Sequence, residues 1–316
     1  MTKMRSLGAT DLKTPPMILG GNVFGWTADR ETSFAILDRW VDAGGTMIDT
    51  ADVYSAWVDG HSGGESESMI GEWLERSGKR DKVLIATKVG MLPGEGGEGL
   101  APARIAAACD ASLKRLKTDR IDLYYAHQDD DSQEMADVLG AFSRLIEAGK
   151  VRVLGASNFH AIRLKQAIDL ATQQDLPHYH VLQPEYNLLS RTSFEGELQD
   201  LCITHNIGVA PYFGLASGFL TGKYRSRDDL SKSARGSRVE GFLDGNGPAM
   251  LAAMDQVAEE TGASLSQIAL AWLAAQEGVT APIASATSVE QLDELIGSWE
   301  VALSKDQLAR LTNAGG

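Results

Sequence analysis

The chain has 316 residues, which is enough for one large domain or two of ordinary size. Hydrophobic residues make up 43% and charged residues 23%, a balance that provides a sizeable core and does not indicate disorder. The formal net charge of −14 argues against binding to nucleic acid or to an acidic membrane surface, because both require a cationic face.

Cys109 and Cys202 are the only cysteines, and both fall at apolar positions of predicted helices. They indicate two buried thiols rather than a disulfide framework or a zinc site. Residues 1–12 contain no apolar segment of signal-peptide length, and no apolar run approaches the roughly 20 residues of a membrane span. We therefore expect a cytoplasmic protein that does not enter a membrane.

The apolar spacing predicts alternating strands and helices. Residues 5–7 and 13–17 flank the turn-prone GATD and predict a short amino-terminal hairpin. Strands are predicted at 17–19, 46–50, 82–88, 121–127, 151–157, 180–186, 207–213 and 280–285. Helices are predicted at 29–43, 65–77, 102–116, 138–146, 158–172 and 194–205, then at 248–260, 265–277, 289–296 and 305–311.

The eight predicted strands are apolar on both faces, which is typical of parallel strands covered by helices. Eight such units in a chain of this length favour a single closed (β/α)8 barrel domain over residues 1–316, rather than an open doubly wound sheet. Residues 215–247 form a long exception that is rich in Gly, Ser and Arg. We predict a lid or a binding loop there.

Three titratable side chains fall at the carboxyl ends of neighbouring predicted strands, namely Asp49, Lys88 and His127. This end of a barrel is where active sites are built, and alternate residues of a strand share a face. Asp49 and Lys88 can compensate each other's loss of hydration as a pair. A cation beside Tyr54 would lower the pKa of its phenol, so that Tyr54 could transfer a proton near neutral pH.

Several segments together resemble the aldo-keto reductases. They are DTADVY (49–54), ATKVG (86–90), YYAH (124–127), GASNF (155–159), LQPEYNLLSR (182–191), PYFGLASGFLTGKY (211–224) and SATSVEQLDEL (285–295). The order and spacing of these segments carry the resemblance over nearly the whole chain. It implies that Asp49, Tyr54, Lys88 and His127 are the four catalytic residues of an NADP-dependent oxidoreductase that reduces carbonyl compounds without a metal.

The resemblance also implies a mechanism and a cofactor site. Tyr54 would protonate the carbonyl oxygen while reduced nicotinamide supplies a hydride, and His127 would orient that oxygen. The implied contacts with the nicotinamide are Ser157, Asn158, Gln183 and the stacking ring of Tyr212. The remaining implied cofactor positions are Gly20, Gly21, Asn22, Phe213, Gly214, Leu215, Ala216, Gly218, Leu220 and Lys223, with Arg238 either on a phosphate or in solvent.

At the adenosine end the resemblance implies contacts from Ser285, Thr287, Gln291 and Glu294. Leu295 stands where an asparagine is common in the family, and residues 285–295 contain no Arg or Lys. Basic residues in that segment would make charge-assisted contacts with the 2′-phosphate of NADPH. The family as a whole favours NADPH, and NADH stays open as the alternative.

Substrate contacts are predicted from the loops that follow the first three strands, with Phe24, Trp57 and Met91 as candidates. Trp57 and Phe24 could equally pack within their own loops. Together they indicate an apolar rim for a small-molecule aldehyde or ketone. The sequence does not decide between a monomer and a homo-oligomer.

Two motif matches point elsewhere and are rejected. GEGGEG (94–99) fits G-x-G-x-x-G, but it follows the third strand and its two glutamates would repel a pyrophosphate. We predict that it is a mobile loop at the substrate mouth. His178 and His180 precede the sixth strand, opposite the active end, and indicate a structural or surface role.

Two other classes of function would also use a barrel of this kind. A cofactor-binding regulatory subunit, like the potassium-channel β-subunits, would keep the four residues and act through a partner. A metal-dependent barrel hydrolase would need carboxylate and histidine ligands at its strand ends.

Overall fold

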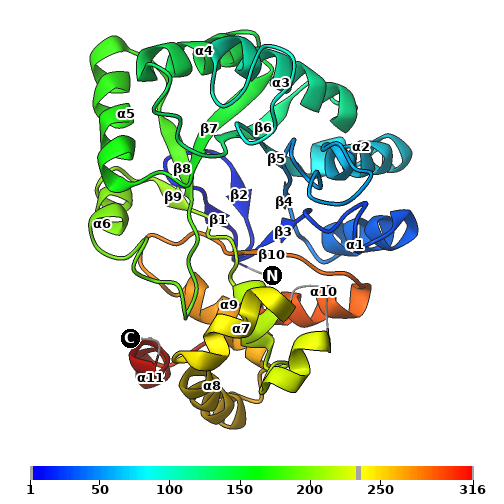
Figure 1. Ribbon diagram of the computed structural model, residues 1–316, viewed down its shortest axis with the longest axis vertical. Coiled ribbons are helices and arrows are strands. Elements are labelled where there is room, and N and C mark those ends of the chain that lie inside the picture. Colours follow the sequence, from blue (N-terminus) through cyan, green and yellow to red (C-terminus); the bar gives the residue numbers. More distant parts are fainter. Residues whose placement is uncertain (1–2, 233–235, 315–316) are drawn as a thin grey trace.

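The protein forms a (β/α)8 barrel, as the strand and helix pattern predicts (Figure 1). The computed structural model describes residues 3–232 and 236–314. Eight parallel strands follow one another in the order β10-β3-β4-β5-β6-β7-β8-β9. Their bounds are β3 Ile18–Gly20, β4 Met47–Asp49, β5 Leu84–Val89, β6 Ile121–Ala126, β7 Val151–Ser157, β8 Tyr179–Gln183, β9 Gly208–Val209 and β10 Ile283–Ala284.

The barrel closes between β9 and β10, the two strands at the ends of this order. Val209 forms a parallel bridge with Val279, and the Ile283 amide donates to the Pro211 carbonyl at 2.8 Å. The strands β9 and β10 are shorter than the predicted 207–213 and 280–285, and β8 ends before the predicted 186. Pro184, Pro211 and Pro282 lie in these stretches, and a proline has no amide hydrogen to continue a strand ladder.

Helices cover the outside of the barrel (Figure 1). In chain order they are α1 Arg30–Asp42, α2 Glu65–Ser77, α3 Pro102–Leu116, α4 Met135–Glu147, α5 Ala161–Gln174 and α6 Glu197–Thr204, then α7 Gly236–Asp244, α8 Gly247–Thr261, α9 Leu265–Ala274, α10 Val289–Ile296 and α11 Lys305–Ala314. Short 3-10 turns lie at η1 Arg80–Lys82, η2 Ala216–Thr221, η3 Arg227–Lys232 and η4 Gly297–Glu300. None of these helices is long and apolar enough to cross a membrane in the part of the chain that the structure describes.

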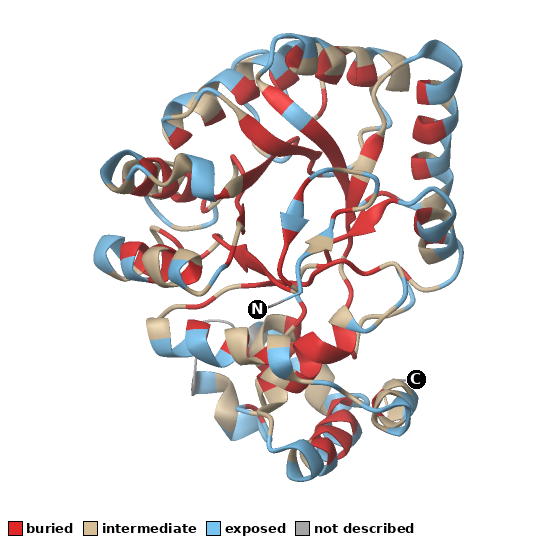
Figure 2. Cartoon of the chain, turned by 180° about the vertical axis from the view of Figure 1, so that it is seen from behind, coloured by how far each residue is buried: buried red, intermediate tan, exposed pale blue. Residues whose placement is uncertain are grey.

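The core has two layers, and buried residues concentrate on the strands and on the inner faces of the helices (Figure 2). One apolar cluster lies between the sheet and the helices. A smaller cluster fills the inside of the barrel and includes Met47, Ala86, Leu123 and Val181. Side chains alternate between the two layers along each strand, which is why the strands read as apolar on both faces.

The predicted amino-terminal hairpin is confirmed as β1 Arg5–Ser6 paired with β2 Lys13–Thr14. Leu7 and Leu12 belong to the cluster inside the barrel, so the hairpin plugs its amino-terminal end. The hairpin also contacts distant parts of the chain. The Ala9 amide donates to the Asn206 carbonyl, and the Arg5 guanidinium donates to the Ala274 carbonyl at 2.7 Å.

Residues 215–247 differ from the predicted loop, because the described part contains η2, η3 and α7. The Val239 side chain is fully buried, and the ring of Phe242 packs on the ring of Phe219 with centroids 5.4 Å apart. Apolar residues at 239, 242 and 243 have helical spacing, but the surrounding Gly, Ser and Arg obscure it in the sequence. Residues 233–235 of this segment lie outside the described part.

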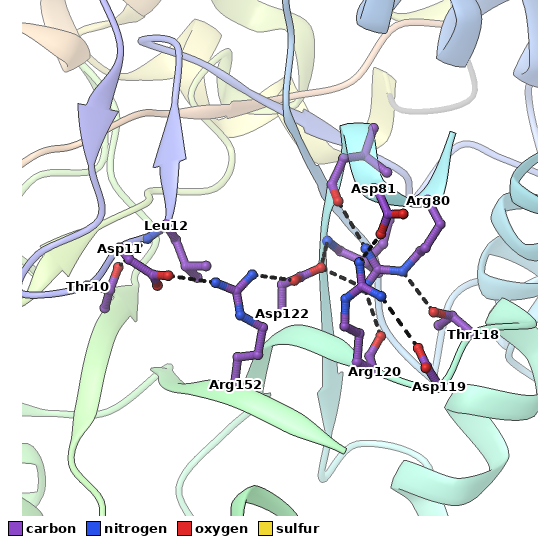
Figure 3. A network of polar contacts seen from close by, with 12 residues as sticks. Thr10, Asp11, Leu12, Arg80, Asp81, Thr118, Asp119, Arg120, Asp122 and Arg152 are labelled. Carbon is purple, nitrogen blue, oxygen red and sulfur yellow. Dashed lines mark hydrogen bonds and ion pairs between the residues drawn. The ribbon is translucent and has the colours of Figure 1, made fainter. Parts of the chain in front are cut away.

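A buried carboxylate ties the hairpin to the amino-terminal end of the barrel (Figure 3). Asp122 on β6 is 1% exposed and accepts hydrogen bonds from the Arg80 guanidinium at 2.7 Å and the Ile85 amide at 2.9 Å. Its other oxygen accepts from Arg152 at 2.8 Å, and Arg152 donates in turn to Asp11 in the hairpin turn. The guanidinium groups of Arg80 and Arg152 are partly exposed and can also bind water. The buried Asp122 carboxylate depends on these protein partners for its hydrogen bonds.

We expect Asp122→Asn to lower the free energy of unfolding by about 2–3 kcal/mol, because an amide cannot accept from two arginines and the Ile85 amide with equal strength. Urea unfolding monitored by circular dichroism measures this change. The matched control is Asp119→Asn, whose exposed carboxylate pairs with Arg120 at 3.6 Å and should change the free energy by less than about 0.5 kcal/mol. Equal effects of the two substitutions would contradict the prediction.

Candidate active site

Four polar side chains meet at the carboxyl ends of β4, β5 and β6. Asp49 is the last residue of β4, Lys88 lies near the end of β5, and His127 directly follows β6. The register pairs Asp49 with Ala86 and Lys88 with Tyr125, which staggers these side chains around one end of the barrel. Tyr54 reaches the same place from the loop after β4. The structure therefore brings together the four residues that the sequence singled out.

The Lys88 ammonium is the centre of this group and is fully buried. It donates to Asp49 Oδ1 at 2.6 Å, to the Thr50 carbonyl at 2.7 Å and to the Tyr54 hydroxyl at 3.2 Å. These contacts use all three of its donors. Burial alone would lower the pKa of Lys88, but the charges and hydrogen bonds of Asp49 and Tyr54 together outweigh burial, and the pKa is raised. Lys88 is therefore a fixed cation.

Asp49 is satisfied on both of its oxygens. Besides Lys88, it accepts from the Gln183 amide nitrogen at 3.1 Å. Gln183 lies at the end of β8, so a strand from across the barrel interior holds the second oxygen. A buried carboxylate with a cation and an amide donor has little freedom to move, and it fixes the position of Lys88.

The pKa of the Tyr54 phenol is raised, whereas the sequence led us to expect a lowered one. Burial raises its pKa above the ordinary value of 10.0, and the opposing effect of Lys88 does not overcome it. The phenol therefore keeps its proton through the physiological range. This state suits a proton donor better than a proton acceptor.

His127 is held as a neutral imidazole. Burial, and then the charge of Lys88, lower its pKa well below 6.5. Its ring lies edge-on to that of Tyr54, with centroids 6.0 Å apart, and its Nδ1 makes no hydrogen bond within the described residues. A neutral ring offers one N–H donor, and a second polar molecule could complete its hydrogen bonding.

A cavity of about 760 Å³ opens beside these residues and is lined by Asp49, Tyr54 and His127. Every cofactor position that the sequence predicts also lines it, except Ala216 and Leu220, whose side chains are buried. Sequence reasoning did not assign nine further residues of its wall, which are Val23, Trp26, Thr27, Ser217, Thr221, Ser266, Ile283, Ala284 and Leu295. A volume of this size accommodates a cofactor or a drug-sized molecule.

Ser157, Asn158 and Tyr212 form a connected polar group on the cavity wall. The Ser157 hydroxyl donates to the Gln183 carbonyl at 2.8 Å, and the Asn158 amide donates to the His127 carbonyl at 2.9 Å. The Tyr212 hydroxyl donates to Asn158 Oδ1 at 2.7 Å. These contacts fix the amide of Asn158 and the hydroxyl of Tyr212 beside His127.

The segment from Phe213 to Gly218 has an unusual backbone. Phe213, Ala216, Ser217 and Gly218 all have positive φ, a conformation that turns successive peptide groups and can form a concave anion site. A Cβ on Gly218 would lie 3.1 Å from the Lys223 ammonium, so glycine allows the lysine to approach the backbone. This combination suits a phosphate group.

Aromatic side chains line the other end of the cavity. The Trp57 ring is 44% exposed and packs edge-on against both Trp26 and Tyr54, each with centroids 5.6 Å apart. Met91 lines the same cavity. Phe24, by contrast, is fully buried and does not line it. Trp26, two residues further along the same loop, lines the cavity instead of Phe24. The turn that brings Trp26 and not Phe24 to the cavity wall has no clear signal in the sequence.

Neither of the rejected motifs lines the cavity. Residues 94–97 close a tight turn in which Gly94 and Gly97 exchange backbone hydrogen bonds. His178 directly precedes β8 and His180 is the second residue of that strand, with ring centroids 6.2 Å apart. No group of three or more potential metal ligands occurs among residues 3–232 and 236–314.

Asp52, two residues before Tyr54, is fully buried beside Glu67 and Arg104. Burial, and then the charge of Glu67, raise the pKa of its carboxyl to about 7, against the opposing effect of Arg104. The folded protein therefore keeps a proton that the unfolded chain releases near pH 4. The protonated Asp52 carboxyl therefore contributes favourably to the free energy of unfolding at low pH, and this contribution is lost as the pH rises toward 7.

We expect Asp52→Asn to remove this pH dependence. Between pH 4 and pH 7.5 the free energy of unfolding of the wild type should fall relative to that of the variant, by about 4 kcal/mol at most. Urea unfolding at both pH values measures it. A difference that stays constant with pH would contradict the raised pKa.

Comparisons with known proteins agree with the fold. The sequence profile described as "Aldo/keto reductase family" matches residues 16–315. The chain is 33% identical over 315 residues to "Uncharacterized oxidoreductase YrpG" of Bacillus subtilis, covering 97% of this chain and 94% of that relative.

Two other relatives have more specific names. The chain is 30% identical over 323 residues to "L-glyceraldehyde 3-phosphate reductase" of Escherichia coli (strain K12), covering 97% of this chain and 90% of that relative. It is 31% identical over 310 residues to "Probable voltage-gated potassium channel subunit beta" of Arabidopsis thaliana, covering 94% of this chain and 91% of that relative. With its barrel and its profile match over nearly the whole length, the chain belongs to the aldo/keto reductase family.

Proposed function

We propose that the protein reduces aldehydes and ketones to alcohols with NADPH, and that Tyr54 donates the proton. The observation that carries the proposal is the buried Lys88 ammonium, whose three donors join Asp49, the Thr50 carbonyl and the Tyr54 hydroxyl. This arrangement holds one protonated phenol at the wall of a large cavity. It supports proton transfer at that phenol more than any other chemistry.

Reduced nicotinamide would supply the hydride that the carbonyl carbon accepts. The Tyr54 phenol would give its proton to the carbonyl oxygen, and the adjacent Lys88 cation would stabilise the phenolate that remains. The neutral ring of His127 would donate its N–H to the same oxygen and orient it. Two donors on one oxygen polarise the carbonyl, so we propose that no metal takes part.

The cavity wall suits the cofactor along its length. Ser157, Asn158 and Gln183 offer hydroxyl and amide groups for the carboxamide of nicotinamide, and Tyr212 offers an aromatic face. Lys223 and Arg238 supply the basic side chains of the wall, and both come from the segment that follows β9. Two cations suit the pyrophosphate and the 2′-phosphate of NADPH, which is why we propose NADPH rather than NADH.

The test is to follow the loss of NADPH absorbance with a panel of aldehydes and ketones, and to repeat it with NADH. We expect turnover with several carbonyl compounds and a KM for NADPH at least about tenfold below that for NADH. Equal KM values would contradict the cofactor preference and leave the reductase proposal standing. Turnover with no carbonyl compound would contradict the reductase proposal.

A second candidate is a cofactor-binding regulatory subunit, favoured by the likeness to the potassium channel subunit relative. Tight NADPH binding without turnover would support this reading. We also propose that the protein acts in the cytoplasm, where the buried free thiols of Cys109 and Cys202 would stay reduced.

A further inference from the structure

Arg104, in the first turn of α3, joins two segments next to the active site while lying outside the cavity wall. Its side chain is buried and donates to the Leu92 carbonyl at 3.0 Å and to the Glu95 carbonyl at 3.2 Å. Its remaining nitrogen donates to Asp52 Oδ2 at 3.4 Å. One rigid guanidinium therefore fixes the loop after β5 relative to the residues that precede Tyr54.

The loop after β5, residues 90–101, is called the mouth loop here because Met91 lines the cavity. Glycines at 94, 96, 97 and 99 give it wide conformational freedom, and the last three have positive φ. Its other hydrogen bonds join Gly94 with Gly97, the Ala101 amide with the Glu98 carbonyl, and the Leu100 amide with Asp130, and the Gln128 side-chain amide makes a long contact of 3.4 Å with the Gly90 carbonyl. Arg104 thus supplies the two shorter side-chain hydrogen bonds that hold the half of the loop next to Met91, at Leu92 and Glu95.

Close packing shows that the guanidinium fits between these segments. A Cβ on Gly94 would lie 2.8 Å from Arg104 Nη1, so the loop backbone lies against the arginine head. The Leu92 side chain reaches the loop after β4, where a Cβ on Gly63 would lie 2.9 Å from it. Movement of the mouth loop would therefore disturb both Arg104 and its contact with Asp52.

Asp52 is the third hydrogen-bond partner of Arg104 at this place. It is fully buried, and its Oδ1 makes no hydrogen bond with the described residues. Glu67 is a second buried carboxylate nearby, and it forms an ion pair with Arg115 at 2.6 Å. Arg104 is the cation that approaches Asp52 within ion-pair distance in the described chain. The same side chain thus contacts Asp52 and holds the mouth loop.

We propose that Arg104 is a positioning residue that fixes Met91 at the substrate mouth and so sets how bulky a carbonyl substrate the enzyme accepts. The proposal rests on the proposed reductase function of the same site. The hydrogen bonds of Arg104 go to Leu92, Glu95 and Asp52, and Lys88 holds Tyr54 independently of them. Loss of the anchor should therefore change substrate binding at the mouth and leave the chemical step intact.

The test compares Arg104→Lys and Arg104→Met with wild type on a bulky aldehyde, 2-naphthaldehyde, and a small one, propanal. A lysine keeps the positive charge beside Asp52 but cannot donate to both loop carbonyls from one fixed plane. For both variants we expect KM for 2-naphthaldehyde to rise by about tenfold, with kcat and the KM for propanal within about twofold of wild type. Thermal unfolding confirms that each variant is folded.

The matched control is Arg163→Met, which removes an arginine of α5 that pairs with Asp129 at 2.7 Å and does not contact the mouth loop. It should leave the ratio of the two KM values unchanged. An equal loss on both aldehydes, or an Arg104→Lys variant that discriminates like wild type, would overturn the inference. The first would indicate a general structural role, and the second would indicate a role for charge alone.

Hydrogen exchange of the mouth-loop amides is a second measurement that needs no turnover. Faster exchange over residues 91–99 in Arg104→Lys, with no change in α5, would support the anchor, and unchanged exchange would overturn it. A wild-type protein that reduces no carbonyl compound would instead contradict the proposed function. The two failures are therefore distinguishable.

Discussion

Replacing Tyr54 by Phe should lower kcat/KM for aldehyde reduction by about three orders of magnitude while NADPH binding is retained. The substitution removes the one hydroxyl that both lines the cavity and contacts Lys88. Lys88 keeps Asp49 and the Thr50 carbonyl as acceptors, so the site should stay assembled. Steady-state kinetics with NADPH and a titration of protein fluorescence with NADPH measure the two effects.

The matched control for this substitution is Tyr179→Phe. The Tyr179 hydroxyl is buried and makes no hydrogen bond within the described residues, and its ring packs between those of Phe142 and Phe159. Its removal should leave both kinetics and cofactor binding unchanged. A Tyr54→Phe variant that reduces aldehydes at the wild-type rate would show that another group supplies the proton.

Replacing Lys88 by Met should reduce activity by about two to three orders of magnitude and destabilise the fold by about 3–5 kcal/mol at neutral pH. The activity falls because the phenolate of Tyr54 loses its neighbouring cation. The stability falls because Asp49 remains buried with only the Gln183 amide as a partner. The loss of stability should shrink as the pH falls toward about 4, because Asp49 can then be protonated in the unfolded chain as well.

A double variant separates these two effects. Adding Asp49→Asn to Lys88→Met removes the uncompensated charge, so stability at neutral pH should recover while activity stays low. Urea unfolding and steady-state kinetics on the single and double variants provide the comparison. A double variant as unstable as Lys88→Met would mean that packing of the lysine chain, and not the charge of Asp49, accounts for the loss.

The sequence was sufficient for the ends of the strands. Two-residue alternation along a strand decides which face a side chain occupies, and Lys88 and Asp49 stand out because a charge interrupts an apolar run. The same logic placed His127 beside them. Because parallel strands share one carboxyl end, no knowledge of the turns was needed to bring these three together.

Other features depended on geometry that the sequence does not encode locally. Phe24 and Trp26 are both aromatic and lie two residues apart, and only the path of the turn decides which one lines the cavity. The raised pKa of Tyr54 follows from how deeply the phenol is buried, and a list of neighbouring charges does not reveal that. The helix α7 lies in a glycine-rich, serine-rich stretch and is stabilised by packing against η2.

The hairpin plug has a consequence for how the chain folds during synthesis. The hairpin is made first, yet its partners include Asn206 and Ala274, which emerge from the ribosome much later. The apolar side chains of Leu7 and Leu12 must therefore wait while most of the barrel is translated. Contacts of such long sequence separation form slowly and late, so closure of the amino-terminal end should be among the last folding events.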